Sequence, residues 1–216
     1  MSPYAILSAL LLYPDAAWRR ELATLTSAVR ALPASPAADA IARFIGWAAS
    51  TPPLAVERAY VESFDFSKRS GLYLSFYAYG DRRQRGVAML ALKQRYAAAG
   101  WPLRHGELPD YLPALLEFAA LAPDAAGELL AELRPAIELV RAGLARANSR
   151  YVILLDALCD LLGELGDAER EEVERLAREG APSERVGLEP FAPPETMPKT
   201  CAAASGSPRP VAGGVG

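Results

Sequence analysis

Few residues in this chain combine the types and spacings that site chemistry requires. Its 216 residues hold one histidine, His105, and two cysteines, Cys159 and Cys201. A structural zinc site needs about four such ligands in paired spacing, so the sequence predicts neither a zinc site nor a disulfide framework. His105 stands in a loop with glycine and proline nearby, which is typical of a solvated histidine rather than the base of a catalytic triad.

Two pairs of carboxylates have helical spacing. Asp110 and Glu117 would share one face of a helix, where they could act as acid and base or attract a basic ligand. Asp156 and Asp160 lie at i and i+4 on an apolar segment and could share a metal ion, but the sequence shows no partner ligand. A polar helix edge is the simpler interpretation of both pairs. The sequence therefore predicts no catalytic residues, no metal and no cofactor.

Composition excludes further classes of protein. The sequence holds no phosphate-binding loop, dinucleotide fingerprint, nucleophile elbow or HExxH motif. A net charge of −3 argues against a dedicated nucleic-acid binder, which usually carries a basic excess. No stretch reaches the roughly 18 apolar residues of a membrane span, and the N-terminus lacks the basic start of a secretory signal. We expect a soluble, cytoplasmic protein that reaches a membrane only indirectly, through a client.

The elements that must position any site are helices. Alanine, leucine, glutamate and arginine are abundant, and no run alternates polar with apolar residues, which predicts an all-α fold. Asp15 and Ser35 are expected N-caps, and Pro135 either kinks a helix or begins another. Helices are expected at 4–12, 16–32, 36–50, 53–64, around 72–79, at 82–99, 110–121, through the apolar seam 130–144, at 151–165 and at 167–178.

The chain divides into two parts by composition. Residues 1–180 carry the apolar periodicity of one compact helical bundle, within a chain that is 51% hydrophobic. Residues 181–216 hold 7 prolines and 5 glycines and show no such periodicity. A stretch of this kind cannot bury enough surface to offset its chain entropy, so we expect a disordered tail.

Aromatic and charged residues gather in two segments, 60–86 and 107–121. At the end of the first segment, an arginine opens a methionine and aromatic stripe that runs on beyond it, which suits the end of an apolar groove. Plain core packing, with Asp81 and Arg85 paired along the helix, is the alternative. The stripe consists of Arg85, Met89, Leu92 and Tyr96.

Four stretches carry a resemblance: LSALLLYPD at 7–15, FDFSKRSGLYL at 64–74, YGDRRQRG at 79–86 and LPDYLPALLEF at 108–118. In order and spacing they resemble the respiratory nitrate reductase molybdenum cofactor assembly chaperones (NarJ type). These belong to the all-helical redox-enzyme maturation chaperones, which include the chaperones of trimethylamine N-oxide and dimethyl sulfoxide reductases. The match covers about residues 4–166. Nothing is transferred to the tail.

The resemblance implies a chaperone and not an enzyme. Such proteins bind the N-terminal segment of the catalytic (alpha) subunit of nitrate reductase. They hold the apo-subunit in the cytoplasm while the molybdenum cofactor is inserted, and then release it to its membrane anchor. The implied ligand is a short amphipathic peptide, often basic, which Asp110 and Glu117 would favour.

Where the family motifs coincide with apolar stripes, we expect the wall of a peptide groove. Its candidate members are Met89, Tyr96, Tyr111, Leu112 and Phe118. The polar candidates are Tyr79, Asp81, Arg82, Arg85, Asp110 and Glu117. The arginines either bind the peptide or lock helices together through Asp81 or Asp110. Other hypotheses are a chaperone of this fold for a different molybdoenzyme, a small helical enzyme, and a helical transcription regulator.

Overall fold

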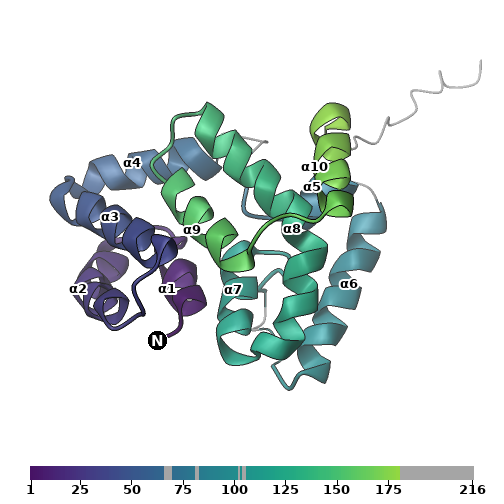
Figure 1. The fold of residues 1–216 in the computed structure, drawn as a ribbon, viewed down its shortest axis with the longest axis horizontal. Helices are drawn as coiled ribbons and strands as arrows, with labels where there is room; N and C mark the ends of the chain where they lie inside the picture. The colour runs from purple at the N-terminus through teal and green to yellow at the C-terminus, as the bar shows by residue number, and fades with distance from the viewer. Residues whose placement is uncertain (66–69, 81–82, 102, 104–105, 181–216) are drawn as a thin grey trace, which may run out of the picture. The chain divides into compact units, whose positions relative to one another are not determined.

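The computed structural model describes residues 1–65, 70–80, 83–101, 103 and 106–180. Within them the regular structure is helical, as predicted, with an isolated antiparallel bridge between Tyr73 and Tyr111 (Figure 1). In chain order the helices are α1 (Pro3–Leu10), α2 (Ala16–Arg30), α3 (Pro36–Ser50), α4 (Pro53–Phe64), α5 (Ser75–Tyr79), α6 (Arg83–Ala98), α7 (Leu112–Leu121), α8 (Pro123–Arg146), α9 (Val152–Leu162) and α10 (Asp167–Glu179). The predicted tail lies outside the described residues.

Local sequence signals set where several helices begin. The Asp15 side chain accepts a hydrogen bond from the Trp18 amide at 2.8 Å, and Ser35 accepts one from the Ala38 amide at 3.2 Å. Both caps satisfy amides of a first turn that have no partner within the helix. Pro135 lies inside α8, which runs through it as one helix of 24 residues. The alternative of a second helix beginning at this proline is therefore wrong.

The apolar helix α9 is central, as its sequence predicts. It packs against α3 on one side and α8 on the other, and Figure 1 shows it between them. Leu154, Leu155 and Leu158 have no exposed surface. The α1 helix packs on α7, and α10 packs on α8. The α10 helix buries only Leu176, in keeping with a mostly charged, solvated last helix.

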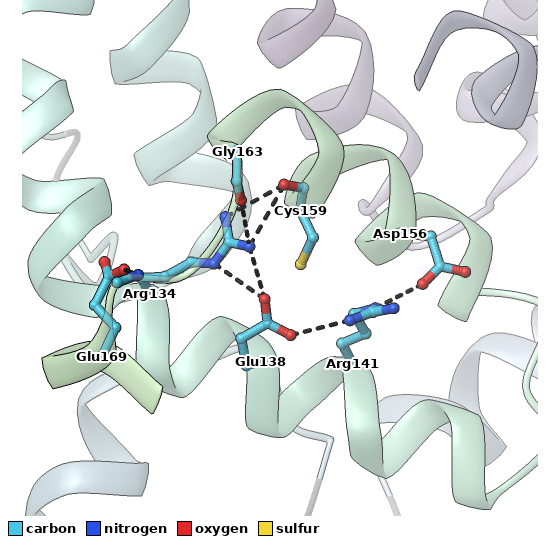
Figure 2. A network of polar contacts seen from close by, with 8 residues as sticks. Arg134, Glu138, Arg141, Asp156, Cys159, Gly163 and Glu169 are labelled. Carbon is cyan, nitrogen blue, oxygen red and sulfur yellow. Dashed lines mark hydrogen bonds and ion pairs between the residues drawn. The ribbon is translucent and has the colours of Figure 1, made fainter. Parts of the chain in front are cut away.

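A charged network joins α8 to the end of α9 (Figure 2). The buried Arg134 donates to Glu138 at 2.7 Å and to the backbone oxygens of Gly163 at 3.1 Å and Cys159 at 3.4 Å. It thereby satisfies carbonyls that a helix end leaves without partners. Arg141 continues the network, since it donates to the second oxygen of Glu138 and to Asp156.

The two aspartates with i, i+4 spacing have different surroundings. Asp156 accepts from Arg141 at 2.6 Å, and Asp160 is exposed on α9. Over the described ranges, no three acidic, cysteine or histidine side chains gather in a way that could hold a metal ion. Within the same ranges, no helix is both long and apolar enough to cross a membrane.

Candidate functional site

Asp110 lies in the turn before α7 and is fully buried. Its Oδ2 atom accepts hydrogen bonds from the Ser75 hydroxyl and from Arg85 at 3.2 Å. Arg85 also donates to the Ser75 hydroxyl at 3.0 Å. This centre ties the start of α5 and the first turns of α6 to the turn before α7. A buried carboxylate needs such partners, because its charge would otherwise lose hydration without compensation.

The prediction that Asp110 and Glu117 share a helical face is wrong. The α7 helix begins at Leu112, with Pro113 in its first turn, so Asp110 precedes it. Glu117 lies on the helix and is half-buried. Because Asp110 is buried and paired with Arg85, it offers no free charge to a ligand.

Arg85 acts as a lock between segments, which was one of its two predicted roles. Its partner is Asp110, from a distant part of the sequence, and not a neighbour on its own helix. Asp81 and Arg82 lie outside the described residues. The Oδ1 atom of Asp110 has no hydrogen-bond partner among the described side chains and backbone.

This lock places two tyrosines side by side. The Leu74 amide donates to the Asp110 carbonyl at 2.9 Å, and the Leu112 amide donates to the Leu72 carbonyl at 2.9 Å. These two bonds form the isolated bridge, and they bring the rings of Tyr73 and Tyr111 to 5.3 Å between centroids.

The row of rings continues across the molecule from Tyr111. The side chains of Tyr111 and Tyr60 lie close enough for each to affect the pKa of the other. The Tyr60 hydroxyl donates to the Leu11 carbonyl at 3.3 Å, and the ring of Tyr60 lies 5.4 Å from that of Tyr13, at an angle of 83°. We call Tyr13, Tyr60, Tyr73 and Tyr111 the tyrosine surface. Tyr13 is 47% exposed and Tyr73 44%, Tyr111 is half-buried, and Tyr60 is buried beneath them. Of these four residues, only Tyr111 is among the site residues predicted from the sequence.

Carboxylates border the tyrosine surface. Desolvation, followed by the charge and hydrogen bond of Glu57 and the charges of Asp65 and Asp15, raises the pKa of Tyr13. Burial raises the pKa of Tyr60 and Tyr111, and the charge of Asp65 adds to both. One carboxylate therefore acts on Tyr13, Tyr60 and Tyr111, and the raised pKa values keep these three hydroxyl groups neutral near pH 7.

The other predicted groove residues divide by burial. Tyr96, Leu112 and Phe118 have no exposed surface, and Tyr96 and Phe118 pack with ring centroids 4.6 Å apart. In this structure they are core residues that support the site from within. Met89 is partly exposed on α6, and Tyr79 is 36% exposed at the end of α5. Peptide binding by these side chains stays a prediction.

Comparison with known proteins places this arrangement in a family. The model of the nitrate reductase delta subunit family matches residues 15–160, more than half of the chain. The chain belongs to the nitrate reductase delta subunit family. This confirms the resemblance carried by the four motif stretches. The match includes Tyr60, Tyr73, Arg85, Asp110 and Tyr111.

Curated relatives of this delta-subunit family chain include assembly chaperones. The probable nitrate reductase molybdenum cofactor assembly chaperone NarJ of Bacillus subtilis is 34% identical over 172 residues, which cover 79% of this chain and 92% of that protein. NarJ of Escherichia coli K12 is 35% identical over 188 residues, 84% of this chain and 79% of that protein. The nitrate reductase-like protein NarX of Mycobacterium tuberculosis is 36% identical over 162 residues, which cover 73% of this chain and 24% of NarX.

Proposed function

We propose that this chain is a non-enzymatic assembly chaperone of nitrate reductase. It binds the N-terminal segment of the apo catalytic subunit in the cytoplasm and keeps that subunit competent for molybdenum cofactor insertion before membrane docking. Family membership supports this role, and relatives that match most of the chain carry the name of molybdenum cofactor assembly chaperones.

One structural observation supports the location of the client site. Three of the four family-like stretches each bring one tyrosine to the tyrosine surface: 7–15 brings Tyr13, 64–74 brings Tyr73, and 108–118 brings Tyr111. The remaining stretch, 79–86, supplies Arg85, which holds Asp110 beside Tyr111. Motifs far apart in sequence thus converge on one exposed aromatic surface and the lock beneath it.

We expect the client segment to bind as an amphipathic peptide whose apolar side packs against the tyrosine surface. Burying about 400 Å² of apolar area would favour binding by roughly 10 kcal/mol before costs. The entropy lost when the peptide is ordered and loses its translational freedom offsets much of this favourable free energy. Micromolar to nanomolar affinity is the expected result, which allows the client to be released after maturation.

Of the predicted groove residues, Tyr111 and Met89 keep accessible surface for direct contact. Tyr96 acts from below, since its hydroxyl donates to the Pro109 carbonyl at 2.9 Å and fixes the turn that carries Tyr111. In this proposal, therefore, the exposed rings contact the client, and the buried residues Tyr96, Leu112 and Phe118 hold those rings in position.

A calorimetric titration tests the proposal. The ligand copies about fifteen N-terminal residues of the catalytic subunit from the same organism, beside a scrambled peptide and the equivalent peptide of a different molybdoenzyme. We expect selective micromolar or tighter binding to the first. Absence of binding to both the nitrate reductase peptide and the other molybdoenzyme peptide would contradict the proposal. Preference for the second of these would show that the other molybdoenzyme is the client.

Substitution of Tyr111 tests the location. Tyr111→Ala should weaken binding about tenfold while the thermal midpoint changes little, because the lost contacts are partly at the surface. Val87→Ala is the matched control, since Val87 is 67% exposed on α6 and lies outside the tyrosine surface. A large fall in the midpoint with unchanged affinity would show that Tyr111 serves the fold alone.

A further inference from the structure

We infer that the outward side of α6 is a docking surface for an acidic, amphipathic helix of a protein partner. This surface lies on the side of α6 opposite the buried residues Leu92 and Tyr96, and all its members are exposed. We call it the α6 face, and it consists of Arg83, Gly86, Val87, Leu90, Ala91 and Lys93. It lies outside the tyrosine surface, so the inference does not depend on the proposed function.

The inward side of α6 accounts for the position of this helix in the fold. Of its 16 residues, only Leu92 and Tyr96 are buried. Arg85 anchors the first turn through its ion pair with Asp110, and Arg95 anchors the last turns through ion pairs with two carboxylates of α8. Figure 1 shows α6 lying along α8. Because these contacts hold α6 in place, the apolar residues of the α6 face are not needed to do so.

Two aliphatic residues stand exposed at the centre of the α6 face. Val87 is 67% exposed and Leu90 is 57% exposed. They are three residues apart on the helix and are therefore neighbours, and the exposed Ala91 extends the apolar area. Single exposed aliphatic residues are common on soluble proteins, but adjacent ones rimmed by charged residues are a feature of interaction sites.

The charge on α6 has one sign. The helix carries Arg83, Arg85, Lys93 and Arg95 and no acidic residue. Among the ion pairs of the described residues, Arg85 and Arg95 have carboxylate partners, whereas none involves Arg83 or Lys93. Two positive charges without carboxylate partners therefore lie on either side of the exposed aliphatic pair.

A glycine within the helix marks where a partner can approach closely. Gly86 is exposed one turn before Leu90, and a Cβ atom built on it would meet no heavy atom within 4 Å. Glycine inside a helix is less stable than alanine, so this position costs stability that no close neighbour in the chain requires. Without a side chain here, the backbone of a second helix can lie against α6.

Charge complementarity selects the occupant. An amphipathic helix can lay its apolar side on Val87 and Leu90 while its carboxylates reach Arg83 and Lys93. A second copy of this chain using the same face would bring the cations of both copies together without a carboxylate between them. An anionic lipid surface would repel a chain with a net charge of −3, and a nucleic acid would meet an apolar centre. We therefore commit to an acidic helix of a protein.

Two synthetic helices serve as probes for the α6 face. Each has about eighteen residues with leucine and alanine along one side, and glutamates flank this side in one probe where lysines flank it in the other. Both are titrated into the full chain by calorimetry. The glutamate probe should bind with micromolar affinity, at least tenfold tighter than the lysine probe, and its affinity should fall as the salt concentration rises.

Variants of the α6 face test the location. Leu90→Gln should weaken binding of the glutamate probe about tenfold with little change in the thermal midpoint, and the double variant Arg83→Gln/Lys93→Gln should remove the preference for glutamate. Gly86→Ala should weaken binding several-fold while raising the thermal midpoint by about 2 °C, because alanine favours the helix but obstructs the approach of a partner.

Leu121→Gln is the matched control, since Leu121 is 63% exposed at the end of α7 and lies outside the α6 face. It should bind the glutamate probe as the unchanged chain does. Absence of binding, equal affinity for the two probes, or binding that Leu90→Gln and the double variant leave unchanged would overturn the inference. None of these results bears on the proposed function, which is tested by the client peptide.

Discussion

Two arginine–carboxylate centres join distant helices of this fold, and they differ in how completely they are paired. Around Arg134 and Glu138, both carboxylate oxygens have arginine partners, and the guanidinium also holds two backbone carbonyls at the end of α9. Around Arg85 and Asp110, one carboxylate oxygen is used twice, and the other has no partner among the described residues.

The two centres also differ in what they hold in place. The Arg134 centre joins the C-terminal end of α9 to α8, and its residues lie outside the four family-like stretches. Arg85 and Asp110 lie within those stretches, and their pairing fixes the segments that carry the rings of Tyr73 and Tyr111. We therefore expect one buried ion pair to serve the stability of the fold, and the other to serve the shape of the proposed binding surface.

The largest effect is expected at the Arg134 centre. Arg134→Met should lower the free energy of unfolding by about 4 kcal/mol, because it leaves the buried Glu138 without its closest partner. Urea unfolding measures this loss, and client-peptide affinity of the folded protein should stay unchanged. The double variant Arg134→Met/Glu138→Leu should regain much of the stability. A loss of affinity without a loss of stability would reverse the roles assigned to the two centres.

A smaller loss of stability, joined to a loss of binding, is expected at Asp110. Asp110→Asn keeps the shape of the side chain but removes the charge that pairs with Arg85, which should cost about 2 kcal/mol. Because the lock positions Tyr111, peptide affinity should also fall several-fold at temperatures where the variant is folded. Unfolding and calorimetric titration of the same sample measure both, and unchanged affinity would show that the lock is structural only.

The smallest effect is a dependence of stability on pH through Glu138. Burial alone would raise the pKa of this carboxyl, but hydrogen bonds with Cys159, Arg141 and Arg134 outweigh it and hold the pKa below its usual 4.5. A carboxyl with a lowered folded-state pKa stabilises the fold above its unfolded pKa, and that stability is lost as the pH falls through the lowered value. The stability difference between the unchanged chain and Glu138→Gln should therefore shrink in acid. A difference that stays constant down to pH 3 would contradict this.

Local signals in the sequence were sufficient to predict most of the helices. Asp15 and Ser35 cap the helices assigned to them, and the apolar positions around Leu154 mark the central helix. Pro135 shows the limit of such signals, since packing along both halves of α8 keeps one helix where propensity alone allows two.

The site was less predictable because it is built from contacts between distant residues. The motif stretches contain Arg85, Asp110 and Tyr111, and the structure pairs Arg85 with Asp110. Helical spacing placed Asp110 on α7, but that helix begins only at Leu112. The meeting of Tyr13 with Tyr60 crosses from the turn after α1 to α4. No periodicity within one helix could indicate it.

Hydrogen exchange with and without the client peptide tests the central claim most directly, because it reports on both regions at once. The account predicts added protection in the segments that form and hold the tyrosine surface, at 12–15, 57–65, 72–79 and 107–112, and no change around Arg134 and α9. Protection confined to α8 and α9, with the tyrosine surface unaffected, would contradict it.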